Sequence, residues 1–90
     1  MKHNLKTVQP YFEACWNGVK KFEVRKNDRN FAVGDTVFLR EYDADSDTYS
    51  GRALMVTVQY VLTEYEFIYL GCCVFSFKIE DYLLNYKPTT

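Results

Sequence analysis

Three side chains between Gly18 and Asp35 have types and spacing that suit them to bind a polar ligand. Lys20, Glu23 and Arg25 fall in a short run that alternates charged and apolar residues. Lysine and arginine donate hydrogen bonds to carbonyl or phosphate oxygens, and a glutamate carboxylate accepts them from the N–H groups of a base. This set could therefore bind a nucleotide or a small polar heterocycle. Ion pairs on a solvated sheet face would account for the same residues, so both interpretations stay open.

Metal and thiol chemistry find less support in the sequence. There is one histidine, His3, near the start of the chain, where a surface position is expected, and no C-x-x-C pair. A zinc site is therefore not predicted. The three cysteines, Cys15, Cys72 and Cys73, are odd in number, which favours reduced thiols and a cytoplasmic setting. Neighbouring residues of a strand point to opposite faces, so a disulfide between Cys72 and Cys73 is not expected.

An acidic segment from position 43 to 51 invites a comparison with calcium-binding loops. Asp43, Asp45 and Asp47 have the D-x-D-x-D spacing with which an EF-hand loop begins. Position six of that pattern, which requires glycine, is Thr48, and position twelve, which requires glutamate, is Leu54. A solvated hairpin loop is the prediction here. Neither a metal nor a cofactor is expected elsewhere in the chain.

The elements that must position the charged residues are mostly strands. Ninety residues suffice for one domain, 1–90, and an aromatic content of 18% favours strands. Alternation of apolar and polar residues predicts strands at His3–Val8, Lys20–Lys26, Thr36–Tyr42, Arg52–Tyr65 and Glu66–Ile79. We expect a mainly β (α+β) fold, a small partly closed β-barrel of five or six strands with a short helix after the first. The tail 80–90 is expected to fray or to form a short helix, and no apolar run is long enough to span a membrane.

The short helix is expected within Gln9–Gly18. Pro10 suits a first helical turn, and Phe12 and Trp16 are spaced four apart, so that their rings meet on one face. Gly18 is placed to end the helix in the left-handed conformation. Gly71, inside the last predicted strand, is expected to mark a bulge or a close approach of the backbone.

The strand Lys20–Lys26 has one apolar and one charged face. Phe22 and Val24 alternate with Lys21, Glu23 and Arg25. The pattern predicts that the two apolar side chains fill the barrel and that the charged ones point outward.

The octapeptide GVKKFEVR resembles G-x-K-x-x-E-x-R, the signature of the ASCH domain, a PUA-like β-barrel. Gly18, Lys20, Glu23 and Arg25 carry the match. Together with RKNDRNFAVGD and LREYD, the wider run is similar to a branch of that superfamily from bacteria and phages that has no assigned activity. The resemblance extends from about position 3 to position 71.

The resemblance implies a module that binds RNA or a nucleotide. Lys20, Glu23 and Arg25 would line a cleft between the first helix and the barrel, with Glu23 reading a base edge. With the basic first half of the chain, which has eight Lys or Arg and four Asp or Glu in residues 1–40, it also suggests phosphate contacts. These would come from Lys26, Arg29 and Arg40. A monomer is expected, without a membrane partner.

Two other functions stay open at this point. Some ASCH proteins are amidohydrolases of acylated cytidine, with a lysine at the position of Lys20 and a threonine where this chain has Glu23. Lys20 and Glu23 would then be the catalytic pair, with Glu64 or Glu66 as the distant carboxylate. The third function is a protein-interaction domain that offers a strand edge to a partner.

Overall fold

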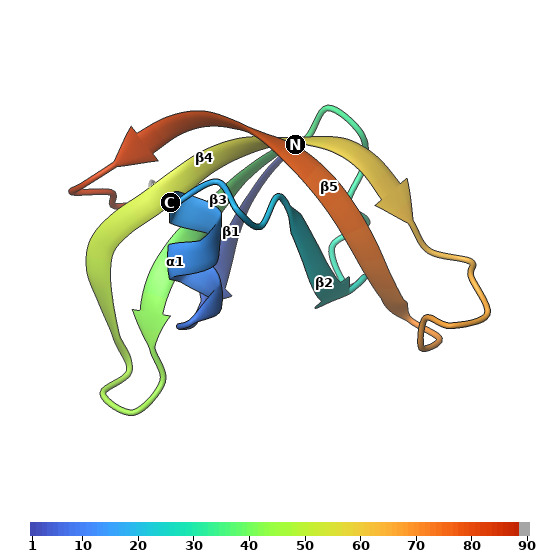
Figure 1. Ribbon diagram of the computed structural model, residues 1–90, viewed down its shortest axis with the longest axis horizontal. Helices are drawn as coiled ribbons and strands as arrows, with labels where there is room; N and C mark the ends of the chain where they lie inside the picture. Colours follow the sequence, from blue (N-terminus) through green and yellow to red (C-terminus); the bar gives the residue numbers. More distant parts are fainter. Residues whose placement is uncertain (89–90) are drawn as a thin grey trace.

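A strongly curved sheet of five strands forms the body of the protein in the computed structural model of the chain, which describes residues 1–88. Its elements are β1 (Lys2–Thr7), α1 (Tyr11–Trp16), β2 (Phe22–Lys26), β3 (Thr36–Asp43), β4 (Thr48–Leu62) and β5 (Cys72–Leu83). The strand order is β1-β3-β4-β5-β2; β1 pairs with β3 in parallel and the other pairs are antiparallel. The sheet arches over α1 as a half-barrel, open between β1 and β2 (Figure 1). The expected mainly β fold with one short helix after the first strand is confirmed.

Side chains on the concave face of the sheet form most of the core, and Cys15 of α1 and Phe31 of the segment between β2 and β3 complete it. Buried residues alternate with more exposed ones along the strands, as in β5, where Cys73, Phe75 and Phe77 are buried. The other members are Leu5, Cys15, Phe31, Val37, Leu39, Leu54, Val56 and Val58. This alternation follows from the pleat, which sends successive side chains to opposite faces.

His3 belongs to this buried face, so the expectation of a surface histidine was wrong. The residue is 6% exposed, its ring lies 4.9 Å from that of Phe31, and its Nε2 lies 2.8 Å from Asp35 Oδ2. Asp35 also accepts a hydrogen bond from the backbone N–H of Ala32. The pair ties the start of β1 to the turn before β3, which gives His3 a structural role.

The helix is shorter than the expected Gln9–Gly18 span, because it begins after Pro10 and ends at Trp16. Pro10 precedes the helix as its N-cap and does not lie in its first turn, as was expected. Two other predicted features are present: Phe12 and Trp16 pack with ring centroids 5.7 Å apart, and Gly18 has a φ of +76°. Trp16 also contacts Tyr82 of β5 edge to face, which fixes α1 against the concave side of the sheet. Across residues 1–88, no helix combines the length and the apolar character needed to cross a membrane.

Two loops differ from the sequence-based boundaries. β3 and β4 extend toward each other, so the acidic loop is confined to 44–47 instead of spanning 43–51. Conversely, β4 ends at Leu62 and β5 begins at Cys72, so residues 63–71 form a loop where continuous strands were expected. Gly71 closes this loop with a φ of +84° and accepts a hydrogen bond from the Asn27 N–H. It marks a turn, not a bulge.

The segment up to residue 88 is anchored to the sheet, so the prediction of a frayed or helical tail was wrong for the described part. β5 continues to Leu83, and Tyr86 then crosses the convex face of the sheet, where its ring stacks on Phe38 at 4.6 Å and its hydroxyl donates to Asn4. Gly51 permits this crossing, because a Cβ there would lie 2.9 Å from the Leu84 carbonyl oxygen. Residues 89 and 90 lie outside the described residues.

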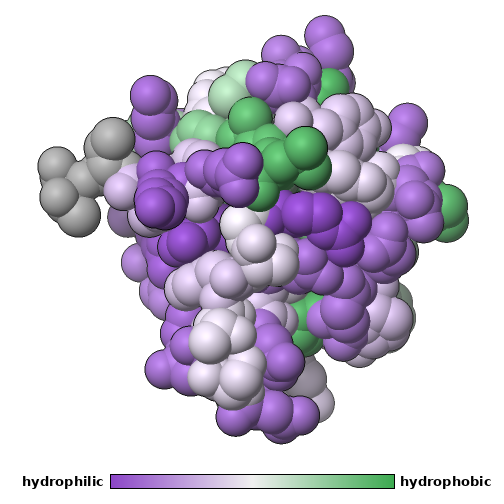
Figure 2. Space-filling view, turned by 90° about the vertical axis from the view of Figure 1, so that its left-hand side faces the viewer, coloured by the Kyte–Doolittle hydropathy of each residue, from purple (hydrophilic) through white to green (hydrophobic). Residues whose placement is uncertain are grey.

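The side of the molecule on which the β3–β4 hairpin projects is mostly hydrophilic (Figure 2). The largest hydrophobic patch on this side lies near its upper end, and the other hydrophobic residues are scattered. The polar character agrees with the acidic composition of the hairpin, whose loop includes Asp45 and Asp47.

Candidate functional site

The pairing of β2 with β5 turns the charged face of β2 inward. Glu23 pairs with Phe75 and Arg25 with Cys73, and both partners are buried on the concave face. Residues directly opposite each other in an antiparallel pair share one face of the sheet. Glu23 is accordingly only 4% exposed.

The predicted orientation of β2 was therefore wrong. Phe22 and Val24 are 46% and 61% exposed and do not fill the barrel. The alternation in the sequence was real, but register, not apolar character, decides which face of this edge strand points inward.

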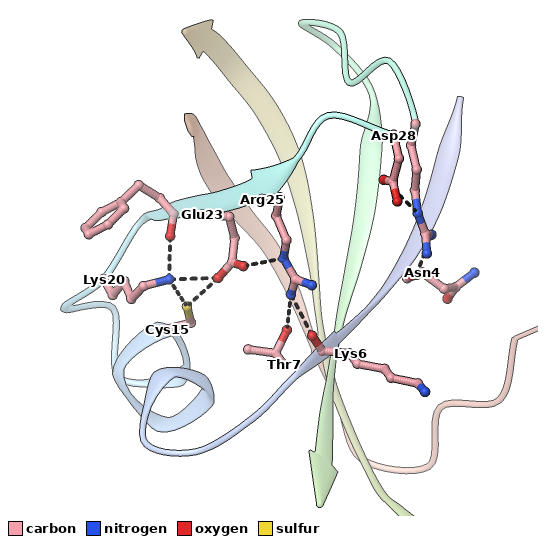
Figure 3. A network of polar contacts seen from close by, with 10 residues as sticks. Asn4, Lys6, Thr7, Cys15, Lys20, Glu23, Arg25 and Asp28 are labelled. Carbon is pink, nitrogen blue, oxygen red and sulfur yellow. Dashed lines mark hydrogen bonds and ion pairs between the residues drawn. The ribbon is translucent and has the colours of Figure 1, made fainter. Parts of the chain in front are cut away.

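Glu23 stands between the two cations and holds both of them. Its Oε1 accepts a hydrogen bond from Lys20 Nζ at 2.7 Å, and its Oε2 accepts one from Arg25 Nε at 2.9 Å. Lys20 Nζ also donates to the Phe22 carbonyl at 2.7 Å (Figure 3). The three residues that the sequence singled out thus form one hydrogen-bonded group. Charge-assisted bonds of this length are among the stronger ones in proteins.

Arg25 extends this group across the opening of the half-barrel. Its Nη2 donates to the Lys6 carbonyl at 2.6 Å and, more weakly, to the Thr7 hydroxyl at 3.4 Å. Arg29 makes a similar contact farther along β1, from Nη1 to the Asn4 carbonyl at 2.7 Å. Guanidinium groups therefore bind carbonyls of the edge strand β1, where a further strand would otherwise pair.

A cleft of about 590 Å³ lies at this opening. Its walls come from the end of β1, from Tyr11 of α1 and from β2 with the residues before it: Lys6, Thr7, Val8, Tyr11, Lys20, Phe22, Glu23, Val24 and Arg25. The volume lies in the range of small-molecule sites, roughly 300–1,000 Å³. Tyr11 and Phe22 are both partly exposed, and the Lys20 ammonium lies 6.0 Å and 4.9 Å from their ring centroids.

Lys20 and Arg25 differ in how many of their hydrogen-bond donors are already engaged. Lys20 has three N–H donors, directed at Glu23, at the Phe22 carbonyl and, at 3.9 Å, at the Cys15 sulfur. Arg25 uses Nε and Nη2, whereas its Nη1 has no hydrogen-bond partner among residues 1–88. A ligand oxygen could bind Nη1 without displacing a protein group. For Lys20 it would have to replace the weak contact with sulfur.

Cys15 of α1 completes the base of the group. Its sulfur lies 3.9 Å from both Lys20 Nζ and Glu23 Oε1, and the residue is fully buried. Burial, partly opposed by the Lys20 charge, raises the pKa of the thiol to about 11. Cys15 is therefore a neutral thiol at physiological pH, and the thiol is a poor nucleophile compared with the thiolate.

The three expected phosphate contacts lie away from the cleft. Lys26 is exposed beyond its end, Arg29 binds the Asn4 carbonyl, and Arg40 lies on the convex face of the sheet beside Tyr86. None of the three lines the cleft. The structure thus brings Lys20, Glu23 and Arg25 together and separates them from the other three.

A second hollow, of about 560 Å³, adjoins the cleft at Val8 and was missed in the sequence. Glu41 lies at its edge and accepts hydrogen bonds from Arg52, Gln9 and Ser50. Chiefly because Arg52 donates to it, the pKa of Glu41 falls to about 2. Arg52 also pairs with Glu13 of α1, so this network joins β3, β4 and the helix. Residues so far apart in the chain leave no local pattern by which they could have been found.

In the part of the chain that the structure describes, no three or more His, Cys, Asp or Glu side chains are arranged to hold a metal ion. In the acidic hairpin, Asp43 instead accepts a hydrogen bond from the Asp45 backbone N–H, and Asp47 accepts one from the Tyr42 hydroxyl. These contacts are those of a self-capped hairpin loop.

Comparison with known proteins relates the chain to one family model and to a phage protein. A segment of 40 residues is 42% identical to an uncharacterized 12.9 kDa protein in the GpA 3′ region of Escherichia phage P2. That segment represents 44% of this chain and 37% of the phage protein. The family model described as a domain of unknown function (DUF3850) matches residues 2–84, nearly the whole sequence. The chain therefore belongs to the DUF3850 family.

Proposed function

We propose that the chain is an RNA- or nucleotide-binding module of the ASCH/PUA-like class, and that its ligand occupies the cleft between β1, β2 and α1. One observation carries the proposal: Arg25 is held rigidly at the cleft by Glu23 and Lys6, and its Nη1 has no partner among the described residues. A guanidinium fixed in this way has little conformational freedom left to lose when it binds an oxygen atom.

The surroundings of Arg25 suit a nucleotide. Two cations, Lys20 and Arg25, line the cleft with a single carboxylate, that of Glu23. An excess of positive charge favours a phosphate group. The partly exposed ring of Tyr11 offers a surface on which a base could stack, as aromatic side chains do in proteins that bind single-stranded RNA.

The proposal gives Glu23 a positioning role in place of the base-reading role that the family resemblance implies. Both of its oxygens accept hydrogen bonds from cations, and little of its surface is exposed. Its carboxylate therefore orients Arg25 and Lys20 toward the ligand. Lys20 contributes its positive charge and, by exchange of the Cys15 contact, one donor.

Hydrolysis of a modified nucleoside has no specific observation in its favour. Lys20 is engaged with Glu23, and the nearby Cys15 is a buried neutral thiol. We therefore propose binding and not catalysis.

The test is an NMR titration of ¹⁵N-labelled protein with UMP and with hexauridylate. We expect the amide shifts to cluster on Lys20–Arg25 and Tyr11, and Arg25→Gln to abolish them while the spectrum remains that of a folded protein. Lys26→Gln is the matched control, since it removes one charge from the neighbouring residue, which lies outside the cleft. Absence of shifts at the cleft with both probes, or equal binding by Arg25→Gln, would refute the proposal.

A further inference from the structure

The guanidinium of Arg40, on the convex face of the sheet, lies close to the rings of two tyrosines. Its guanidinium carbon lies 3.6 Å from the ring centroid of Tyr49 in β4 and 5.6 Å from that of Tyr86, which follows β5. Arginine stacks readily on aromatic faces, and both distances are within the range of cation–π attraction. The two rings therefore restrict the position of the guanidinium group.

Among the described residues the same guanidinium has no anionic partner. No hydrogen bond or ion pair joins Arg40 to another side chain within residues 1–88, although the group has five N–H donors. Arg52 provides an internal comparison, because it too stacks on two rings, those of Phe12 and Trp16 at 5.1 and 4.9 Å. Its donors are taken by Glu41 and Glu13 at 2.8–3.0 Å. At Arg40 two aromatic rings are present as well, but no carboxylate of residues 1–88 pairs with the guanidinium.

Lys6 connects Arg40 to the cleft. It is the Cα partner of Arg40 in the parallel pairing of β1 with β3. Its carbonyl lies at the cleft, where it accepts the hydrogen bond from Arg25, and its ammonium lies 4.6 Å from the ring centroid of Tyr42. Positive charge and tyrosine rings thus continue from the cleft, over the edge of β1, onto the convex face. The acidic loop 44–47 lies beyond Tyr49 and would repel a negatively charged nucleic acid. Such a ligand would therefore approach Arg40 from the side of Lys6.

We propose that Arg40 is a second anion site, which binds a phosphate of the same single-stranded RNA whose neighbouring nucleotide occupies the cleft. That the ligand is RNA rests on the proposed function. The anion site itself rests on two observations, the contact of Arg40 with the tyrosine rings and the absence of an anionic partner for it among residues 1–88. The ligand is then an oligonucleotide and not a mononucleotide. Tyr42 and Tyr49 offer rings on which bases beyond the cleft stack.

The experiment compares the binding of hexauridylate and of UMP by Arg40→Gln and by the unaltered chain. Each phosphate contact on a single strand contributes about 0.7 to the slope of log affinity against log salt concentration. We expect Arg40→Gln to lower that slope for hexauridylate by about 0.7 and to weaken binding about fivefold at 0.1 M salt. The affinity for UMP should not change. Lys78→Gln removes an equivalent charge beside Glu80 and should leave both affinities unchanged.

The outcomes separate this proposal from the proposed function. If hexauridylate and UMP both shift the cleft and Arg40→Gln alters neither affinity, the second site is refuted and the cleft stands. If Arg40→Gln weakens both probes equally, Arg40 acts through the fold and the second site is likewise refuted. If the cleft does not respond but hexauridylate shifts Tyr49 and Arg40, the anion site stands and the proposed cleft function fails. Should Arg40→Gln not fold, Tyr49→Leu removes one ring but keeps the charge, and the proposal then requires weaker binding of hexauridylate alone.

Discussion

The Nη2 atom of Arg25 in β2 lies 2.6 Å from the carbonyl oxygen of Lys6 in β1. The two strands are the edges of the sheet, and no backbone ladder joins them. One side chain therefore bridges the opening of the half-barrel at the same place where the cleft lies. An edge strand with free carbonyls is a template for pairing with another chain, and Arg25 and Arg29 occupy two of those carbonyls on β1.

Replacement of Arg25 should release the edge of β1. We expect Arg25→Gln to lower the free energy of unfolding by about 2–3 kcal/mol, because charge-assisted hydrogen bonds to Glu23 and Lys6 are lost. The variant should also self-associate more strongly than the unaltered chain at the same protein concentration. Urea unfolding and sedimentation velocity measure the two effects. Lys26→Gln, at an exposed neighbour, should change stability by less than about 0.5 kcal/mol, and equal behaviour of the two variants would contradict the bridging role.

Glu23 should be the most sensitive charge in the molecule. Glu23→Gln leaves Lys20 and Arg25 partly buried without their anion, and breaking such a pair costs about 3–5 kcal/mol. We expect the lower end of that range, since both cations retain some contact with solvent. Glu80→Gln breaks an ion pair to Lys78 that is much more exposed and should cost about 0–1 kcal/mol. An equal decrease in the free energy of unfolding for both variants in urea would show that the burial of Glu23 does not add to the stability of the protein.

Stability should fall in acid through Glu41 and Asp35. The hydrogen bond from Arg52 lowers the pKa of Glu41 to about 2, and the contact with His3 lowers that of Asp35. Since both carboxyls have lower pKa values in the folded than in the unfolded state, their stabilisation is complete above the unfolded values and is lost as the pH falls through the folded ones. For Glu41 this window runs from about 4.5 to about 2.

Thermal unfolding between pH 6 and 2 tests this dependence on acid. The unaltered chain should lose stability over that range, and Glu41→Gln should lose less, because one of the responsible carboxyls is absent. Asp35→Asn should act in the same direction. Parallel curves for all three proteins would exclude these two groups as the source of the acid sensitivity.

The exposed face of β2 should tolerate a polar residue. Val24 is 61% exposed, so Val24→Thr should change the free energy of unfolding by less than about 0.5 kcal/mol. Val56, in the core and fully buried, provides the comparison, because a hydroxyl without a partner there costs about 1–3 kcal/mol. A large loss from Val24→Thr in urea unfolding would mean that the apolar side of β2 points inward after all.

Local pattern was enough to predict several parts of the fold. Alternation located five strands, the spacing of Phe12 and Trp16 located the helix, and Gly18 marked its end. These features depend on residues within a few positions of each other, so they can be predicted from a single sequence. Strand ends were less well predicted at 63–71, where apolar residues continue through a loop and Leu70 is fully exposed.

The amino-acid sequence by itself determined which residues of β2 carry charge and that they recur at alternate positions. Only the tertiary structure decided where they point. The register between β2 and β5 places Glu23 opposite the buried Phe75, and so turns the charged face inward. The opening between β1 and β2 likewise depends on strand order, which brings Lys6 to Arg25, 19 positions away. Register and strand order are set by the packing of the whole core, which no short segment encodes.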